Sequence, residues 1–158
     1  MIYLLDLNYT LVANSAPRGT ALAPMRKRLT MECYRPWLVE MLRTHPVILI
    51  TARPERWKEA TLARIGELTG WQPMDAYFDD GSIRTPPAVK RRILLEKIFP
   101  KHGHGEYYAI ESNPKTRTMY AAFGIPSVWV NATGLVLRDH RRLLSQLPTA
   151  IPQEHFEF

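Results

Sequence analysis

Short runs of apolar residues recur along the chain, and each run ends at a polar side chain. The clearest runs are residues 2–5, 47–50, 107–110 and 127–130, with a weaker one at residues 75–78. Continuous runs of this length are typical of strands in a parallel sheet that is covered on both faces. The pattern therefore predicts four buried strands and a candidate fifth.

Stretches with apolar residues at helical spacing lie between these runs. Most of them begin at a proline, whose fixed φ suits the first turn of a helix. The predicted helices are one that begins at Pro36, one from Pro54 to Gly70, one from Pro87 to Pro100, one from Pro114 to Gly124, and one over residues 135–147. Strands that alternate with helices predict an α/β fold with a doubly wound parallel sheet. The chain of 158 residues has the length of one domain, so we expect a single domain over residues 1–158.

A polar residue follows each of the four clearest strands: Asp6, Thr51, Glu111 and Asn131. A single polar residue at a strand end commonly only caps the next helix. The carboxyl ends of parallel strands, however, meet at one edge of the sheet, and ligands of open α/β sheets bind there. Several polar side chains at that edge, with a carboxylate first, predict a functional site.

The charge balance of the chain favours an anionic partner. The 21 Lys and Arg residues exceed the 15 Asp and Glu residues, and the net charge of +6 suits phosphorylated or polyanionic ligands. Four of the cations, Arg18, Arg26, Lys27 and Arg28, follow the first predicted strand. They form either a solvated face or a track for a phosphate backbone.

Cysteine content and hydropathy indicate a cellular compartment. Cys33 is the single cysteine, so the chain has no internal disulfide, and we expect a reducing environment and a buried thiol. No apolar stretch approaches the ~18 residues of a membrane span, and the first apolar run is too short for a signal peptide. We therefore expect a cytoplasmic protein without membrane contact.

The residues at the strand ends resemble the four motifs of the haloacid dehalogenase (HAD) phosphohydrolase superfamily. The segment Leu4–Val12 is similar to motif I, and Thr51 is similar to the Thr or Ser of motif II. Lys90 is similar to the lysine of motif III, and residues 109–113 are similar to motif IV. The motifs occur in the family's order over nearly all of the chain. The resemblance implies an HAD-like fold, and the short spacing between motifs leaves no room for a cap domain.

The same resemblance implies a Mg²⁺-dependent phosphatase, a phosphoric monoester hydrolase that works through an aspartyl-phosphate. Asp6 is then the nucleophile, and Thr51 and Lys90 stabilise the phosphoryl oxygens. The implied Mg²⁺ ligands are Asp6, the backbone carbonyl of Asn8 and the Glu111 carboxylate, with Asn113 or Ser112 beside the ion.

A narrower resemblance links the chain to the phosphatase half of phage-type polynucleotide kinase-phosphatases. It rests on residues 51–55, 90–94, 109–111 and 119–125. It implies that Thr10, Arg18, Ala52 and Arg53 bind the substrate, which is a phosphorylated nucleotide or nucleic-acid end. The kinase half has no counterpart, because the chain contains no G-x-x-x-x-G-K-[ST] loop.

Two positions depart from the pattern of an efficient hydrolase. Asn8 stands where such enzymes have an acid–base Asp, and an amide cannot shuttle protons. Glu111 is followed by Ser112, so motif IV supplies one carboxylate where the family has two. These departures keep a second hypothesis open: a catalytically weakened HAD-like protein that binds a phosphorylated ligand or a host protein.

A proton-shuttling residue from elsewhere, such as His102 or His104, would favour the enzyme. The sequence indicates no oligomeric state. It also does not distinguish a native Asn8 from one introduced to trap substrate.

Overall fold

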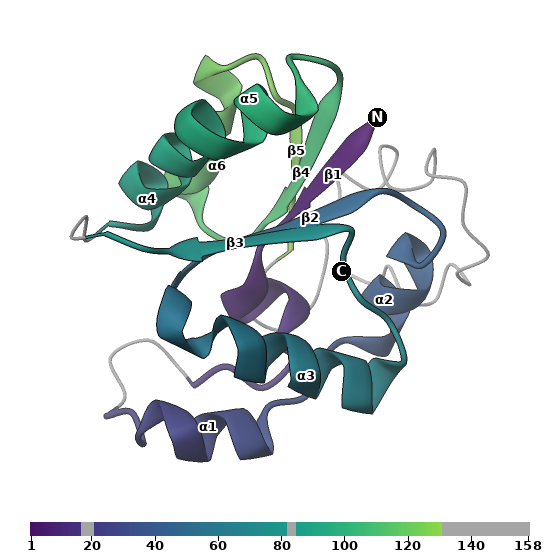
Figure 1. Ribbon diagram of the computed structural model, residues 1–158, viewed down its shortest axis with the longest axis vertical. Helices are drawn as coiled ribbons and strands as arrows, with labels where there is room; N and C mark the ends of the chain where they lie inside the picture. The colour runs from purple at the N-terminus through teal and green to yellow at the C-terminus, as the bar shows by residue number, and fades with distance from the viewer. Residues whose placement is uncertain (17–20, 82–84, 131–158) are drawn as a thin grey trace.

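A parallel sheet forms the centre of the protein in the computed structural model, which describes residues 1–16, 21–81 and 85–130 (Figure 1). Its strands are β1 (Ile2–Leu5), β2 (Val47–Pro54), β3 (Asp75–Asp79), β4 (Tyr107–Glu111) and β5 (Ser127–Trp129). They lie in the order β3-β2-β1-β4-β5, and every neighbouring pair is parallel. The predicted strands and the predicted doubly wound α/β sheet are confirmed.

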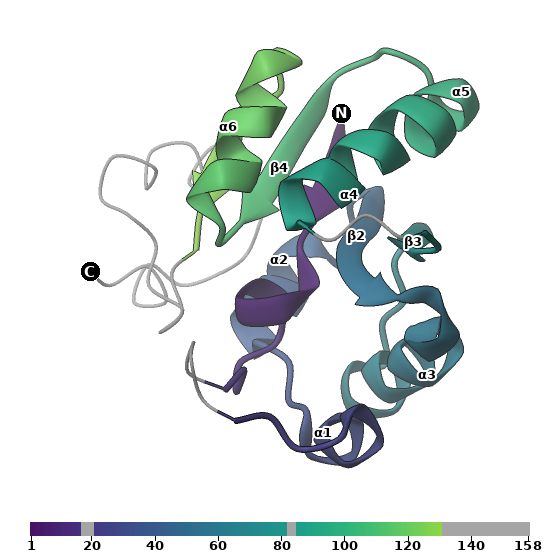
Figure 2. The ribbon, with the colours of Figure 1, turned by 90° about the vertical axis from the view of Figure 1, so that its left-hand side faces the viewer.

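Helices cover both faces of this sheet (Figures 1 and 2). One face carries α2 (Pro36–Leu42) and α3 (Lys58–Thr69), and α1 (Met25–Met31) lies beside α3. The other face carries α4 (Pro86–Ile93), the wider helical turn η3 (Leu94–Ile98), α5 (Phe99–His102) and α6 (Pro114–Ala122).

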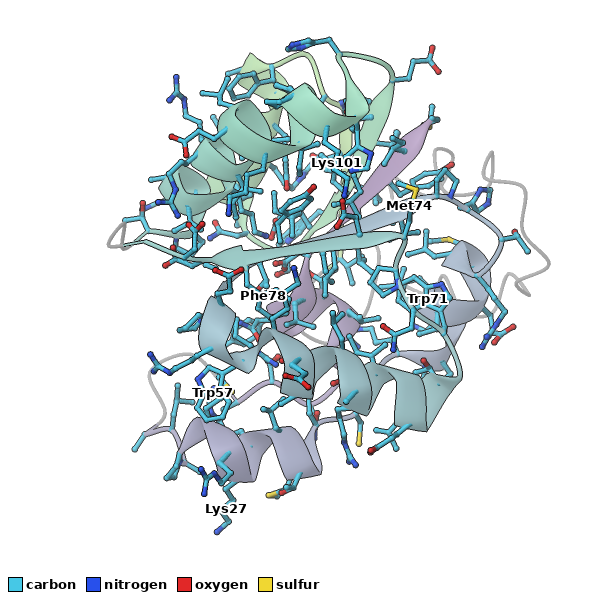
Figure 3. The ribbon with its side chains drawn as sticks, in the orientation of Figure 1. Lys27, Trp57, Trp71, Met74, Phe78 and Lys101 are labelled. Carbon is cyan, nitrogen blue, oxygen red and sulfur yellow. The ribbon has the colours of Figure 1, made fainter. Side chains whose placement is uncertain are left out.

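Alternation along the strands divides the core into two layers. Leu5 and Leu49 pack in the cluster that contains the apolar residues of α2 and α3, and Phe78 points from β3 toward α3 (Figure 3). Leu4 and Ile48 pack on the opposite side, against α4, η3, α5 and α6. The central strands are therefore buried on both faces, which explains their uninterrupted apolar sequence.

Two predicted helix boundaries are wrong, and both involve a proline. Strand β2 runs to Pro54, and α3 begins only at Lys58, after the short turn η2 (Glu55–Trp57). A proline disfavours helical backbone at the residue before it, so Arg53 continues the strand. At the other site, helical structure does not stop at Pro100 but continues through α5 to His102. Helix α5 continues directly from η3, and Ile98 and Phe99 keep helical backbone up to the proline.

Two further expectations are wrong, and others concern residues that the structure does not describe. Helix α1 forms over the segment that carries Arg26, Lys27 and Arg28, where the sequence pattern predicts no helix; Leu29 is its buried residue, so it lacks an apolar face. The Cys33 thiol is exposed, which contradicts the expected burial. Arg18, Asn131 and the helix predicted over residues 135–147 lie outside the described residues. Among the helices that are described, none has both the length and the apolar character needed to cross a membrane.

The direction in which successive strands are added to the sheet reverses between β1 and β4. From β1 the chain adds β2 and β3 on one side, and it then returns to add β4 and β5 on the other. Leu5 of β1 pairs with Ile110 of β4, so Asp6 and Glu111 follow side by side at the carboxyl ends of these strands. The point where an open α/β sheet changes direction is where such folds bind ligands.

Candidate active site

A buried lysine joins the two carboxylates at the carboxyl ends of β1 and β4. The Lys90 ammonium donates to Asp6 Oδ1 at 2.6 Å and to Glu111 Oε2 at 2.7 Å. Lys90 and Glu111 are each 1% exposed, and Asp6 is 7% exposed. Lys90 lies on α4, which packs against one face of the sheet. Asp6, Lys90 and Glu111 therefore meet at one point although they are far apart in the sequence.

The charges of this group depend on one another. Burial alone would lower the pKa of Lys90, but the Asp6 and Glu111 carboxylates outweigh it and raise this pKa above its ordinary value. Burial and the nearby Asp6 raise the pKa of Glu111 to about 7, against the opposite effect of Lys90. The ammonium therefore stays charged, and it is the cation that makes two buried carboxylates tolerable.

The second oxygen of Asp6 is held by two hydroxyl groups. Thr10 Oγ1 donates to Asp6 Oδ2 at 2.6 Å, and Ser112 Oγ lies 3.2 Å from the same oxygen. Ser112 Oγ also lies 3.3 Å from the backbone carbonyl oxygen of Asn8. A carboxylate oxygen, a carbonyl oxygen and a hydroxyl oxygen thus gather on one side of Asp6.

This group of oxygens suits a small hard cation. Ligands at right angles around Mg²⁺, with bonds of about 2.1 Å, lie about 3.0 Å apart, close to the spacing from Ser112 Oγ to its two neighbours. The set contains a single carboxylate. Within the described residues, no three His, Cys, Asp or Glu side chains converge as a metal site. The oxygens fit a Mg²⁺ ion that keeps several waters.

The other two predicted metal ligands point elsewhere. Glu111 Oε1 accepts hydrogen bonds from the backbone N–H groups of Ser112 and Asn113, both at 2.9 Å, and its second oxygen faces Lys90. Asn113 caps α6, where its Oδ1 accepts from the backbone N–H of Lys115 at 2.9 Å. Within the part of the chain that the structure describes, neither side chain hydrogen-bonds to the oxygen group of Asp6 Oδ2, the Asn8 carbonyl and Ser112 Oγ.

Arg53 connects Asn8 to a third buried carboxylate, that of Glu32. Its Nη2 donates to Asn8 Oδ1 at 2.9 Å and to Glu32 Oε2 at 2.7 Å. Its Nη1 donates to Glu32 Oε1 at 3.1 Å and to Thr61 Oγ1 at 3.0 Å. Arg53 is 3% exposed and Glu32 is 6% exposed, so the guanidinium and the carboxylate form a buried pair.

Hydrogen bonds from neighbouring residues stabilise the turn that carries Asn8. In the turn η1 (Leu7–Leu11), Tyr9 has φ +63°, an uncommon conformation for a residue with a side chain. Arg35 Nε donates to the carbonyl oxygen of Thr10 at 2.8 Å, and Tyr9 N donates to Ser15 Oγ at 2.8 Å. These contacts stabilise a turn that strands and helices alone would not hold.

A cavity of about 330 Å³ opens beside this turn. The polar residues Asn8, Tyr9, Arg28 and Glu32 and the apolar residues Leu22 and Met31 are among those that line it. Asn8 and Glu32 therefore both border this cavity. The position of the cavity, between η1 and α1, allows a ligand to approach the Asn8 side of the candidate site.

The sequence also singled out Thr51 and Ala52 of β2 and two histidines, His102 and His104. Thr51 is 1% exposed in β2, and its hydroxyl accepts from the backbone N–H of Arg53 at 3.1 Å. Ala52 packs against the core on the α4 side. His102 lies 3.0 Å from Asp75 Oδ2, at the amino end of β3, and His104 stacks on Phe99 with centroids 4.5 Å apart. The two histidines are thus placed away from the carboxyl edge of the sheet.

Sequence reasoning missed two residues of this site, Glu32 and Arg35. Glu32 and Arg35 flank Tyr34 in a short polar segment between α1 and α2, and no periodic pattern marks them. The sequence signal for Glu32 and Arg35 is weak, because it consists only of two charged residues beside apolar ones. The motif IV resemblance offers Asn113 or Ser112 beside the ion, and of these two it is Ser112 whose hydroxyl lies beside Asp6 Oδ2 and the Asn8 carbonyl.

These features define a class of protein: a doubly wound, Rossmann-like α/β protein with a carboxylate–lysine–carboxylate group where its sheet changes direction. Among solved structures, the chain is similar to one from the Pnkp1/Rnl/Hen1 complex, with a TM-score of 0.63 and 17% identity over 81% of this chain and 44% of that chain. It is also similar to one from the Pnkp1/Rnl/Hen1 RNA repair complex, with a TM-score of 0.63 and 18% identity over 82% of this chain and 42% of that chain.

The chain thus spans less than half the length of these structural neighbours, and at such identities the similarity shows a shared fold. No protein-family model matches the sequence, and no curated protein matches it.

Proposed function

We propose that this protein is a Mg²⁺-dependent phosphohydrolase of the HAD type, which transfers the phosphoryl group of a nucleotide or nucleic-acid end to Asp6. The observation that carries the proposal is the Asp6 carboxylate at the end of β1, held between Lys90 on one oxygen and Thr10 on the other. The matching order of the four motifs supports the same assignment.

The chemistry assigned to Asp6 is attack on phosphorus. A carboxylate is a suitable nucleophile, and the Lys90 ammonium contacts one of its two oxygens. The same ammonium offsets part of the negative charge that accumulates when an anionic nucleophile meets a phosphate group. Thr10 and Ser112 fix the direction of the carboxylate.

The residues that would hold Mg²⁺ are Asp6 through Oδ2, Asn8 through its backbone carbonyl, and Ser112 through its hydroxyl. When bound, the ion supplies charge that draws phosphoryl oxygens toward Asp6. Glu111 acts indirectly in this proposal, because it balances the charge of Lys90 and thereby fixes the position of the ammonium.

Two observations support a nucleic-acid end as the substrate. The structural neighbours come from RNA repair assemblies, although this chain covers less than half of each. The net charge of +6 favours a polyanion, and Arg26 and Lys27 are exposed on α1 beside the cavity-lining Arg28.

A second candidate function is the binding of a phosphorylated ligand without turnover. It is favoured by Asn8, whose amide cannot carry a proton, and by the single carboxylate of the oxygen group. In this reading the same residues recognise phosphate but complete no reaction cycle.

The test is a phosphatase assay with Mg²⁺ on p-nitrophenyl phosphate and on oligonucleotides with 3′- or 5′-phosphate ends. We expect release of inorganic phosphate. We expect Asp6→Asn to abolish this release while its circular dichroism spectrum stays that of the wild type. Asp80→Asn, which changes a carboxylate paired only with Arg92 and Lys97 among the described contacts, is the matched control. Turnover by Asp6→Asn at the wild-type rate would exclude the mechanism. Tight binding of the oligonucleotide without phosphate release would favour the second candidate.

A further inference from the structure

The residue that stands at the acid–base position has its amide orientation fixed. Asn8 Oδ1 accepts from Arg53 Nη2 at 2.9 Å, and a guanidinium nitrogen only donates. The Asn8 Nδ2 group therefore faces away from Arg53 and acts only as a donor. Position 8 can hydrogen-bond an oxygen of the substrate, but it cannot remove a proton from water.

A carboxylate lies next to it in space. Arg53 Nη2 donates to Glu32 Oε2 at 2.7 Å as well as to Asn8 Oδ1, so the two oxygens are within two hydrogen-bond lengths of each other. Asn8 and Glu32 also line the same cavity of about 330 Å³.

Glu32 has the open acceptor site that a base requires. Its Oε1 accepts from Tyr34 Oη at 2.9 Å and from Arg53 Nη1 at 3.1 Å. Its Oε2 accepts one hydrogen bond among the described contacts, and a carboxylate oxygen can accept two.

The groups described around Glu32 are already protonated near neutral pH, so Glu32 is the candidate base of this cavity. Arg53 faces it from β2, Tyr34 from its own segment, and Arg64 of α3 donates to its backbone carbonyl. Arg28 of α1 lines the cavity. Arginines and a tyrosine are protonated near neutral pH and accept no proton there.

We propose that Glu32 is the general base of dephosphorylation, in the role that Asn8 cannot fill; this inference rests on the proposed function. A water molecule attacks the phosphorus of the Asp6 aspartyl-phosphate, the bond between phosphorus and the Asp6 oxygen breaks, and the water proton passes to Glu32 Oε2. The products are inorganic phosphate and the free Asp6 carboxylate. Glu32 then returns its proton to solvent through the cavity.

The experiment separates the two steps of the cycle with p-nitrophenyl phosphate, whose leaving group needs little acid help. The variant is Glu32→Gln, and Glu40→Gln on the exposed surface of α2 is the matched control. We expect the first turnover of Glu32→Gln to keep its rate and the steady-state rate to fall on the order of 10²-fold. Mass spectrometry after acid quench is expected to find phosphate on Asp6, and added formate is expected to accelerate Glu32→Ala.

The outcomes are distinct. A steady-state rate of Glu32→Gln equal to that of Glu40→Gln overturns the inference. If the first turnover and the steady state fall together, and formate restores nothing, Glu32 only positions Arg53 and the inference is again overturned. Absence of phosphate on Asp6 in every variant, with phosphate still released, contradicts the proposed function itself.

Discussion

Removal of the Lys90 ammonium tests the centre of the site most directly, because this one group neutralises two buried carboxylates. Lys90→Met keeps the length and most of the volume of the side chain but leaves Asp6 and Glu111 without their shared cation. Both carboxylates have low exposure, at 7% and 1%, so water cannot replace the lost contacts. Breaking a buried ion pair by removing one partner costs roughly 3–5 kcal/mol.

We therefore expect Lys90→Met to lower the free energy of unfolding by about 3–5 kcal/mol, a large part of the total for a domain of this size. The assay is a urea titration in which unfolding is followed by tryptophan fluorescence. Trp71, which is buried in the core cluster beside α3, contributes to this signal. Lys97→Met is the control, because Lys97 pairs with Asp80 at the surface, where an ion pair contributes about 0–1 kcal/mol.

A double-mutant cycle isolates the contact itself. Glu111→Gln alone is destabilising, since an amide N–H₂ group would face the ammonium. In the Lys90→Met background the same substitution removes an unpaired charge, so its cost becomes smaller or reverses sign, with a coupling energy of at least about 1 kcal/mol. Strictly additive effects, or a loss below about 1 kcal/mol for Lys90→Met, would refute the buried three-member group.

Three further predictions concern proton transfer, metal binding and acid stability. In the Glu32→Gln background, Asn8→Asp returns one carboxylate to Arg53 and should recover part of the roughly 10²-fold loss in steady-state hydrolysis of p-nitrophenyl phosphate; a double variant as slow as Glu32→Gln would exclude position 8 from proton transfer. Ser112→Ala removes one of three gathered oxygens, so the Mg²⁺ concentration for half-maximal activity should rise roughly tenfold, and superimposable titrations would exclude this donor. Burial alone would raise the pKa of Asp75, but hydrogen bonds from Lys101, His102 and Tyr77 hold it below its usual value. Its stabilising effect is therefore present above about pH 4 and lost on further acidification, and Asp75→Asn should flatten the acid limb of stability measured by thermal unfolding.

The sheet was predictable because its central strands are buried on both faces. Residues 47–50 and 107–110 have only apolar side chains, and the structure places all of them in the core. Helix α1 was not predictable in the same way. It buries Leu29 and exposes Arg26 and Lys27, so its sequence carries no apolar period, and its contact with α3 holds it in place.

The candidate site was predictable only where it coincides with strand ends. Asp6 and Glu111 follow two parallel strands, and the geometry of a parallel sheet brings them together without any further signal. The direction of each side chain was not predictable. Glu111 turns toward Lys90 rather than toward Asn8, because two backbone N–H groups hold one oxygen and the ammonium holds the other. Local sequence does not encode such a choice among competing donors.

The position of Glu32 explains why an amide at position 8 is compatible with this fold. Arg53 carries one positive charge in a buried setting, and Glu32 already balances it through both terminal nitrogens. An Asp at position 8 would place a second carboxylate on the same guanidinium, and one of the two negative charges would lack a buried partner. Asn8 keeps the hydrogen bond to Arg53 without adding charge. The neutral amide at position 8 and the carboxylate at position 32 are therefore parts of one electrostatic arrangement, in which the single buried carboxylate beside Arg53 comes from the segment after α1.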